Sequence, residues 1–148
     1  MTADGLQAFG LARITCKLGR APFDVAFDYD QRYVANTNPT LETFALDHVP
    51  ADSDVTLRAA WPAAAAESYL YFDPVAQALV VRREAMRVSW FATGGTLPVD
   101  ASAVGEDDLA TEVATTWHTP AAGTTWIWIV LRDARGGIAT QTLAVTVE

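Results

Sequence analysis

Residues 116–148 constrain the fold of this chain more than any other segment, because they hold two strand-like runs around one turn signal. Residues 125–132 are almost all β-branched, aromatic or aliphatic, and residues 140–147 form a second run of this kind. Between them lies DARGG, residues 133–137, which is typical of a tight turn. The pattern predicts a β-hairpin.

The composition fits a well-packed globular chain and excludes several classes of partner. The 148 residues are 51% hydrophobic and 19% charged, which is not typical of a disordered protein. The formal net charge of -8 would repel phosphate backbones, so we expect no nucleic-acid partner. No apolar run approaches the roughly 20 residues that a membrane-spanning helix needs, so we expect no membrane span.

The sequence says little about the compartment. Cys16 is the only cysteine, which excludes an internal disulfide and a cysteine-clustered zinc site. Arg13 stands where a signal peptide would need an apolar core, so residues 11–15 encode neither secretion nor lipid attachment. Because the sequence begins abruptly, we expect a piece of a longer protein whose targeting segment is not included.

The rest of the sequence predicts further strands and no amphipathic helix. Residues 1–35 form a first unit, in which residues 23–33 alternate as a half-buried strand does. A linker at residues 36–39 leads into a second unit, residues 36–148. We expect one or two N-terminal strands that pack on an antiparallel β-sandwich. The other strands are expected at residues 11–18, 40–46, 55–61, 69–72, 78–82, 87–93 and 109–117, with a surface loop at 100–108.

Five motifs occur in the order found in a known family of domains. They are NPTL at 38–41, VTLRA at 55–59, VSWFATGG at 88–95, WHTP at 117–120 and LRDARGG at 131–137. With these motifs, residues 36–148 resemble the immunoglobulin-like domains of bacterial cell-surface and secreted proteins, close to polycystic-kidney-disease and fibronectin-like modules. The resemblance implies an all-β, immunoglobulin-like antiparallel β-sandwich with additional N-terminal strands. It places Trp90, Ile127, Ile129 and Leu131 in the core, with Trp117 closing one end of the sandwich.

Aromatic residues are the candidates for a binding site. Trp126 and Trp128 alternate with the core-facing isoleucines, so we expect them on the outer face, where each buries on the order of 200 Å² if covered. Either they are covered within the chain, by the N-terminal strands or by the insertion that contains Tyr69 and Tyr71, or they contact another domain, a second subunit or a sugar ring. Tyr69 and Tyr71 join them as candidate binding residues.

Titratable residues give one candidate metal site and no catalytic centre. His48 and His118 are the only histidines and lie far apart in the sequence, so we expect surface histidines. Arg82, Arg83 and Arg87 are expected to pair with nearby carboxylates. Acidic residues in the loop at 100–108 could bind calcium, and the alternative is a solvated loop. These candidate ligands are Asp100, Glu106, Asp107 and Asp108.

The resemblance and the missing catalytic motifs imply a non-enzymatic chain without a cofactor other than calcium. We expect a structural or protein-interaction module of a bacterial cell envelope or secreted protein, in the setting of a surface lipoprotein. Its partner would be a neighbouring domain or another protein, and its oligomeric state stays open. Two alternatives also stay open. One is a module that binds a glycan or small ligand through exposed aromatics, and the other is an accessory domain of a larger enzyme.

Overall fold

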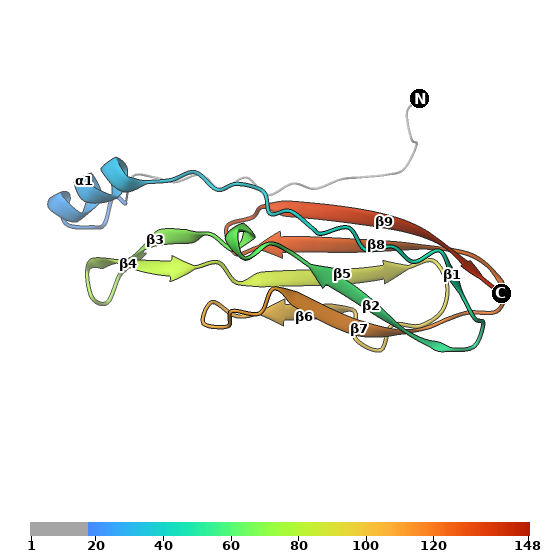
Figure 1. The fold of residues 1–148 in the computed structure, drawn as a ribbon. Coiled ribbons are helices and arrows are strands. Elements are labelled where there is room, and N and C mark those ends of the chain that lie inside the picture. The colour runs from blue at the N-terminus through green and yellow to red at the C-terminus, as the bar shows by residue number, and fades with distance from the viewer. Residues whose placement is uncertain (1–17) are drawn as a thin grey trace, which may run out of the picture.

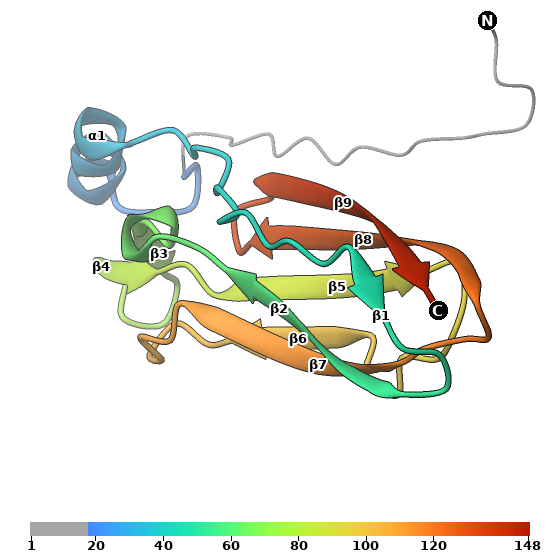
Figure 2. The ribbon, with the colours of Figure 1, turned by 45° about the vertical axis from the view of Figure 1, so that its right-hand side comes forward.

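The chain folds mainly into antiparallel β-structure, as the sequence predicts. The structure, a computed structural model, describes residues 18–148. One sheet has five strands in the order β1-β9-β8-β5-β6, and a second sheet pairs β2 with β7. Figures 1 and 2 show β2 and β7 lying across one face of the larger sheet, which gives the two layers of a sandwich. The strands are β1 (His48–Val49), β2 (Asp54–Ala60), β5 (Met86–Ala92), β6 (Ala101–Val104), β7 (Glu112–His118), β8 (Gly123–Asp133) and β9 (Ile138–Val147).

The core lies between these two layers and contains three of the five tryptophans. Trp90 is 1% exposed and its indole Nε1 donates to Ser102 Oγ at 3.3 Å. Trp117 is fully buried at the end of the sandwich, where its Nε1 donates to the carbonyl of Gly94 at 3.0 Å. The predicted positions of Trp90 and Trp117 are therefore confirmed, and Trp61 is also buried.

The predicted closing hairpin is confirmed as β8 and β9. The two strands pair in register from Gly123 opposite Val147 to Arg132 opposite Ile138. Side chains at alternate positions of β8 are buried, as expected for the core-facing isoleucines. In the turn, Asp133 Oδ1 accepts hydrogen bonds from the backbone N–H groups of Arg135 and Gly137, both at 2.8 Å. This carboxylate therefore fixes the shape of the turn.

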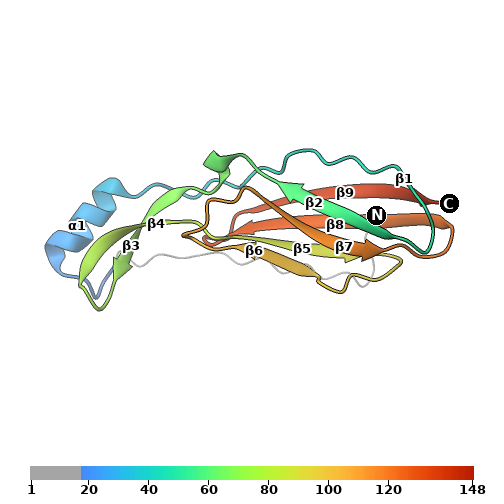
Figure 3. The ribbon, with the colours of Figure 1, turned by 60° about the horizontal axis from the view of Figure 1, so that its bottom comes forward.

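The insertion forms a separate hairpin that projects from one end of the sandwich. Strands β3 (Ser68–Asp73) and β4 (Ala78–Arg83) pair only with each other among the described strands, after the short 3-10 helix η1 (Ala63–Ala65). Figures 1 and 3 show this hairpin next to α1, beyond the end of β8 and β9. The strands predicted at residues 69–72 and 78–82 are therefore confirmed as β3 and β4.

The prediction of a strand at residues 23–33 is wrong, because this segment forms helix α1 (Phe23–Arg32). Apolar residues that recur at every second position also recur at every fourth position, and the fourth-position spacing suits a helix. Two contacts between residues four positions apart support the helix. The ring of Phe23 stacks on that of Phe27, with centroids 6.4 Å apart, and Arg32 forms an ion pair with Asp28 at 2.8 Å. The helix follows Pro22 and has no buried residue. The predicted N-terminal strands are therefore not found here, and residues 11–17 of the other predicted strand lie outside the described residues.

Two further segments differ from the prediction. Residues 40–46 form no strand. Gln141 of β9 forms hydrogen bonds with the backbone of this segment through its side chain rather than through its own backbone. Its side chain accepts from the N–H of Phe44 at 3.3 Å and donates to the carbonyl of Phe44 at 2.6 Å. The predicted loop at 100–108 contains β6, which pairs with β5 through small residues that give no alternation signal. None of the helices in residues 18–148 is long and apolar enough to cross a membrane.

Candidate functional site

The predicted binding residues lie in two separate places. Trp126 and Trp128 lie on the outer face of the five-stranded sheet, whereas Tyr69 and Tyr71 line a cavity next to α1. The structure therefore does not bring the four aromatics together. The first place is an exposed face of the sheet, and the second is a cavity.

The outer face of the five-stranded sheet carries three exposed aromatic side chains. Phe91 is 51% exposed, Trp126 is 47% exposed and Trp128 is 38% exposed. Phe91 lies directly opposite Trp128 in the register of β5 and β8. We call these three residues the outer aromatic face. The hairpin that carries Tyr69 and Tyr71 lies beyond the sheet end, so the expectation that it covers the tryptophans is wrong.

This face also carries two arginines that have no ion-pair partner among residues 18–148. Arg87 of β5 and Arg132 of β8 are directly opposite each other, and both are exposed. Neither forms an ion pair with any residue of the described range 18–148, so the expectation that Arg87 pairs with a carboxylate is not met. Like charges in this position repel each other. By strand alternation, no acidic side chain of the described strands points to this face.

The opposite outer face of the sandwich, on β2 and β7, is built differently. There Arg58 pairs with Glu112 across the two strands, and His118 Nδ1 lies 2.9 Å from Asp54 Oδ1. Cross-strand pairs of opposite charge are typical of a surface that faces water. The two outer faces of one sandwich therefore differ, and only the larger sheet exposes a group of large aromatics without compensating acids.

A buried ion cluster joins the sandwich to the projecting hairpin. Arg135, from the β8–β9 turn, has a side chain that is only 8% exposed. Its Nε donates to Glu84 Oε1 at 2.6 Å, and its Nη2 donates to Glu67 Oε2. Its Nη1 donates to the carbonyl of Val34 at 3.1 Å. We call Arg135, Glu67 and Glu84 the Arg135 cluster, because one guanidinium holds the residues just before β3, just after β4 and just after α1.

The cluster perturbs its own ionisation. Burial raises the pKa of Glu84 above its usual range, although the hydrogen bonds from Arg135 and from the backbone of Glu67 oppose this change. Burial works against the charge of Arg135, but the hydrogen bond to Glu84 and the neighbouring carboxylates raise its pKa overall. Glu84 is completely buried, so its charge depends on this guanidinium and on the N–H of Glu67, which donates to Glu84 Oε2 at 3.0 Å.

The turn next to the cluster is tightly packed against the linker. Asn36 Nδ2 donates to Asp133 Oδ2 at 3.0 Å, and Gly137 lies so close to both side chains that a Cβ atom would overlap the carboxylate. Asn36 Oδ1 is buried without a hydrogen-bond partner among the described residues. The predicted linker therefore has a fixed position against the sandwich.

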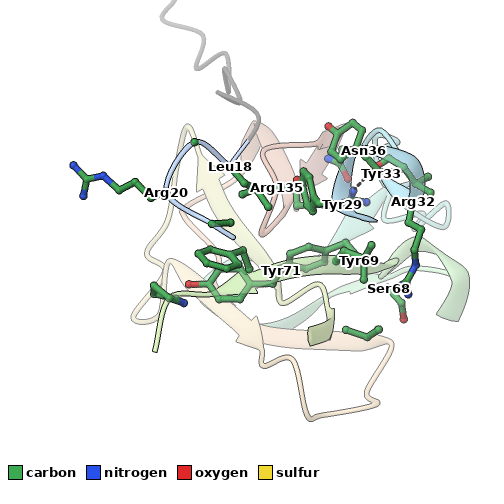
Figure 4. Close-up of a pocket in the computed structure, with 17 residues that line it drawn as sticks. Leu18, Arg20, Tyr29, Arg32, Tyr33, Asn36, Ser68, Tyr69, Tyr71 and Arg135 are labelled. Carbon is green, nitrogen blue, oxygen red and sulfur yellow. Dashed lines mark hydrogen bonds between the residues drawn. The ribbon is translucent and has the colours of Figure 1, made fainter. Parts of the chain in front are cut away.

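A cavity of about 810 Å³ lies between α1 and the projecting hairpin (Figure 4). Four tyrosines line it, and Arg135 lies over the ring of Tyr69 with its Cζ atom 5.1 Å from the ring centre. Tyr71 lies on the same strand as Tyr69, and Arg82 of β4 lies over its ring with the Cζ atom 4.1 Å from the ring centre. No acidic residue of the described range lines the cavity. Its aromatic and basic lining residues are Tyr29, Tyr33, Tyr69, Tyr71, Phe72, Arg20, Arg32 and Arg135.

The candidate calcium ligands are not gathered into a site. Among residues 18–148, no three His, Cys, Asp or Glu side chains lie close enough together to hold a metal ion. Asp108 Oδ1 accepts from the N–H of Ala110 at 2.9 Å, and Glu106 lies 3.9 Å from Arg82. Arg82 thus has the carboxylate partner expected for it. Asp100 and Asp107, the other two candidates, are exposed.

The other polar predictions agree with the structure or are refined by it. His48 and His118 are exposed at strand ends, as expected, and each lies beside a carboxylate. Arg83 donates to the carbonyl of Asp108 at 2.5 Å rather than to a carboxylate. The sequence reasoning missed Glu84, although one signal was present. Glu84 stands two residues before Met86 and so continues the series of core-facing positions with Met86, Val88 and Trp90. This series predicts a buried acid, which needs a cation beside it.

Comparisons with known proteins assign no family. No family model matches the chain, and no curated protein matches it. A solved structure of superoxide reductase (neelaredoxin) from Ignicoccus hospitalis aligns with a TM-score of 0.38 and 12% identity, covering 76% of this chain and 81% of that one. A second structure of that protein aligns with the same TM-score and identity, covering 81% and 86%. We draw nothing about function from a likeness at this level.

Proposed function

We propose that this chain is a non-enzymatic interaction module that binds a protein partner through its outer aromatic face. The observation that carries the proposal is the contrast between the two outer faces. One has paired charges, and the other has three large exposed aromatics beside two arginines that form no ion pair within the described part of the chain. Aromatic residues and arginine are the types that dominate binding energy at protein interfaces.

Energetics supports a macromolecular partner at this face. Three exposed aromatics on the neighbouring strands β5 and β8 leave an apolar surface that water solvates poorly. Neither of the cavities described along the chain includes Trp126 or Trp128. A surface outside these cavities suits a protein partner better than a small ligand, which needs a concave site.

Charge defines the partner further. Arg87 and Arg132 repel each other on a chain whose net charge is -8. A carboxylate of the partner placed between the two guanidinium groups would remove this repulsion and form charge-assisted hydrogen bonds. The partner surface is therefore apolar at its centre and acidic near the β8–β9 turn.

The setting of the module follows from the sequence resemblance. Immunoglobulin-like domains of this type belong to bacterial cell-surface and secreted proteins. We therefore place the chain in the cell envelope or outside the cell, where it docks a neighbouring domain or another protein.

Site-specific photo-crosslinking in cells of the source organism tests the proposal. A photoreactive benzoylphenylalanine replaces Thr142, which faces Trp128 across β8 and β9. The matched control carries the same group at Thr116, an exposed threonine on the outer face of β7. We expect a discrete crosslinked protein from position 142 and none from position 116.

The double variant Trp126→Thr/Trp128→Thr completes the test. Threonine keeps a β-branched side chain in the strand, so we expect a stability loss below about 2 kcal/mol and no crosslink from position 142. A crosslink that survives this variant, an equal crosslink from both positions, or no crosslink at all would contradict the proposal. A large loss of stability would show instead that the tryptophans serve the fold.

A further inference from the structure

We infer that the free edge of β3 is a second binding site, which takes an extended acidic peptide as an additional strand. This site is separate from the outer aromatic face, and neither proposal depends on the other. The inference comes from three features of the projecting hairpin. They are the unpaired backbone of its edge, the cavity along that edge, and the charge of the residues around the cavity.

The backbone pattern shows which groups are unpaired. The N–H of Glu84 donates to the carbonyl of Glu67 at 2.9 Å, which makes these two residues a hydrogen-bonded pair at the base of the hairpin. Bonded and non-bonded pairs alternate along antiparallel strands. The N–H and C=O groups at positions 68, 70 and 72 therefore point away from β4. No backbone hydrogen bond between described residues reaches these groups.

The cavity follows this edge. All five residues from position 68 to position 72 line it, although their side chains alternate between the two faces of the hairpin. We take such a lining to mean that the cavity runs along an edge of the hairpin. Only Val81 lines it from β4, so the edge is that of β3. An incoming strand could therefore pair with β3 and place alternate side chains over Tyr69 and Tyr71 (Figure 4).

The surrounding charge selects the peptide. Arg20, Arg32 and Arg135 line the cavity, and none of its described lining residues is acidic. Arg135 already binds Glu67, Glu84 and a backbone carbonyl. Arg32 forms only an exposed ion pair with Asp28, at 2.8 Å, which costs little to exchange for a carboxylate of a ligand. Figure 4 shows Arg20 directed away from the cavity, so Arg32 is the arginine that a bound peptide would meet. A peptide with an acidic side chain near Arg32 fits this arrangement.

The edge itself lacks the features that normally prevent strand addition. Exposed edges usually carry lysine, proline or a bulge. Here the edge sequence is SYLYF, which combines high β-propensity with no charge. Addition of an extended peptide to such an edge gains main-chain hydrogen bonds, and pockets for alternate side chains provide specificity.

Peptide display on the full chain tests the inference. Random peptides are selected on the immobilised protein, and the enriched sequences are synthesised for affinity measurements. We expect enriched sequences with acidic and β-branched residues and without central proline. N-methylation of alternate peptide amides should abolish binding, because it removes the donors that would pair with β3.

Two variants of one residue separate backbone pairing from side-chain contact. Leu70→Pro removes an N–H that points away from β4, so the hairpin itself should fold, as its melting temperature will show. We expect it to weaken peptide binding about tenfold or more, whereas Leu70→Val should bind like the original chain. Arg32→Gln should weaken acidic peptides by about threefold and leave neutral ones unchanged.

Several results would overturn the inference. One is a selection that enriches no peptide. Another is a set of peptides that bind Leu70→Pro as well as Leu70→Val. A third is binding that tolerates N-methylation, which would show that side chains hold the peptide and that its backbone does not pair with β3. Loss of peptide binding with an intact crosslink from Thr142 would leave the outer aromatic face as proposed.

Discussion

Removal of the Arg135 guanidinium should destabilise the chain more than any exposed substitution. In Arg135→Met, the apolar stem is kept but the hydrogen bonds to Glu84, Glu67 and the carbonyl of Val34 are lost. Glu84 would remain completely buried with no cation beside it. Breaking a buried pair by removing one partner costs about 3–5 kcal/mol, so we expect a loss of this size at about pH 8.

The loss of stability in Arg135→Met should become smaller as the pH falls, because Glu84 can then take up a proton. Its folded-state pKa lies above its usual range, so the folded chain takes up this proton more readily than the unfolded chain. Such a group contributes stability that is fully present below the unfolded pKa and is lost as the pH rises through the folded pKa. Without the hydrogen bond from Arg135 this pKa rises further. The difference between the two proteins should therefore narrow by about 1 kcal/mol or more between pH 8 and pH 5.

Urea unfolding at both pH values measures these differences, provided that the slopes agree between the proteins. Arg132→Met, in the same hairpin, is the matched control, because Arg132 is exposed and forms no ion pair with a described residue. We expect it to change the free energy of unfolding by less than about 0.5 kcal/mol. A loss for Arg135→Met as small as that of the control, or one that does not depend on pH, would refute this reasoning.

Two further predictions concern packing and metal binding. Gly137→Ala should destabilise the chain by about 1–3 kcal/mol, because its Cβ would overlap the Asp133 carboxylate and lie 2.9 Å from Asn36 Nδ2. Gly105→Ala has no heavy atom within 4 Å of the added Cβ, so thermal unfolding should show almost no change, and equal effects of the two substitutions would argue against this packing. Millimolar calcium should leave the melting temperature unchanged, because the candidate ligands are not gathered together. A clear rise in a calorimetric scan would restore the calcium hypothesis.

The strands that sequence reasoning predicts correctly are those with a single consistent period. Residues 126–131 alternate strictly, and the register of β8 and β9 places every second residue in the core. Residues 23–33 carry two patterns at once. Phe23, Val25 and Phe27 alternate as in a strand, while the spacing of Phe23 to Phe27 also suits a helix. No neighbouring strand pairs with this segment, so local contacts decide in favour of α1.

The candidate sites are only partly predictable, because they depend on contacts between distant segments. The outward position of Trp126 and Trp128 follows from alternation alone. The position of Arg87 directly opposite Arg132 depends on the register of β5 and β8, which no local sequence pattern predicts. Arg135 lies in a turn whose sequence predicts an exposed position. It is buried because the insertion and the residues just after α1 fold over it.

The most direct test of the outer aromatic face is fluorine NMR of the chain labelled with 5-fluorotryptophan. The sequence has five tryptophans, of which Trp61, Trp90 and Trp117 are buried. We predict that a soluble paramagnetic agent broadens only the resonances of Trp126 and Trp128, and that the protein found by crosslinking shifts these same two. Protection of all five in the free chain, or a partner that shifts only the buried three, would contradict the proposed function.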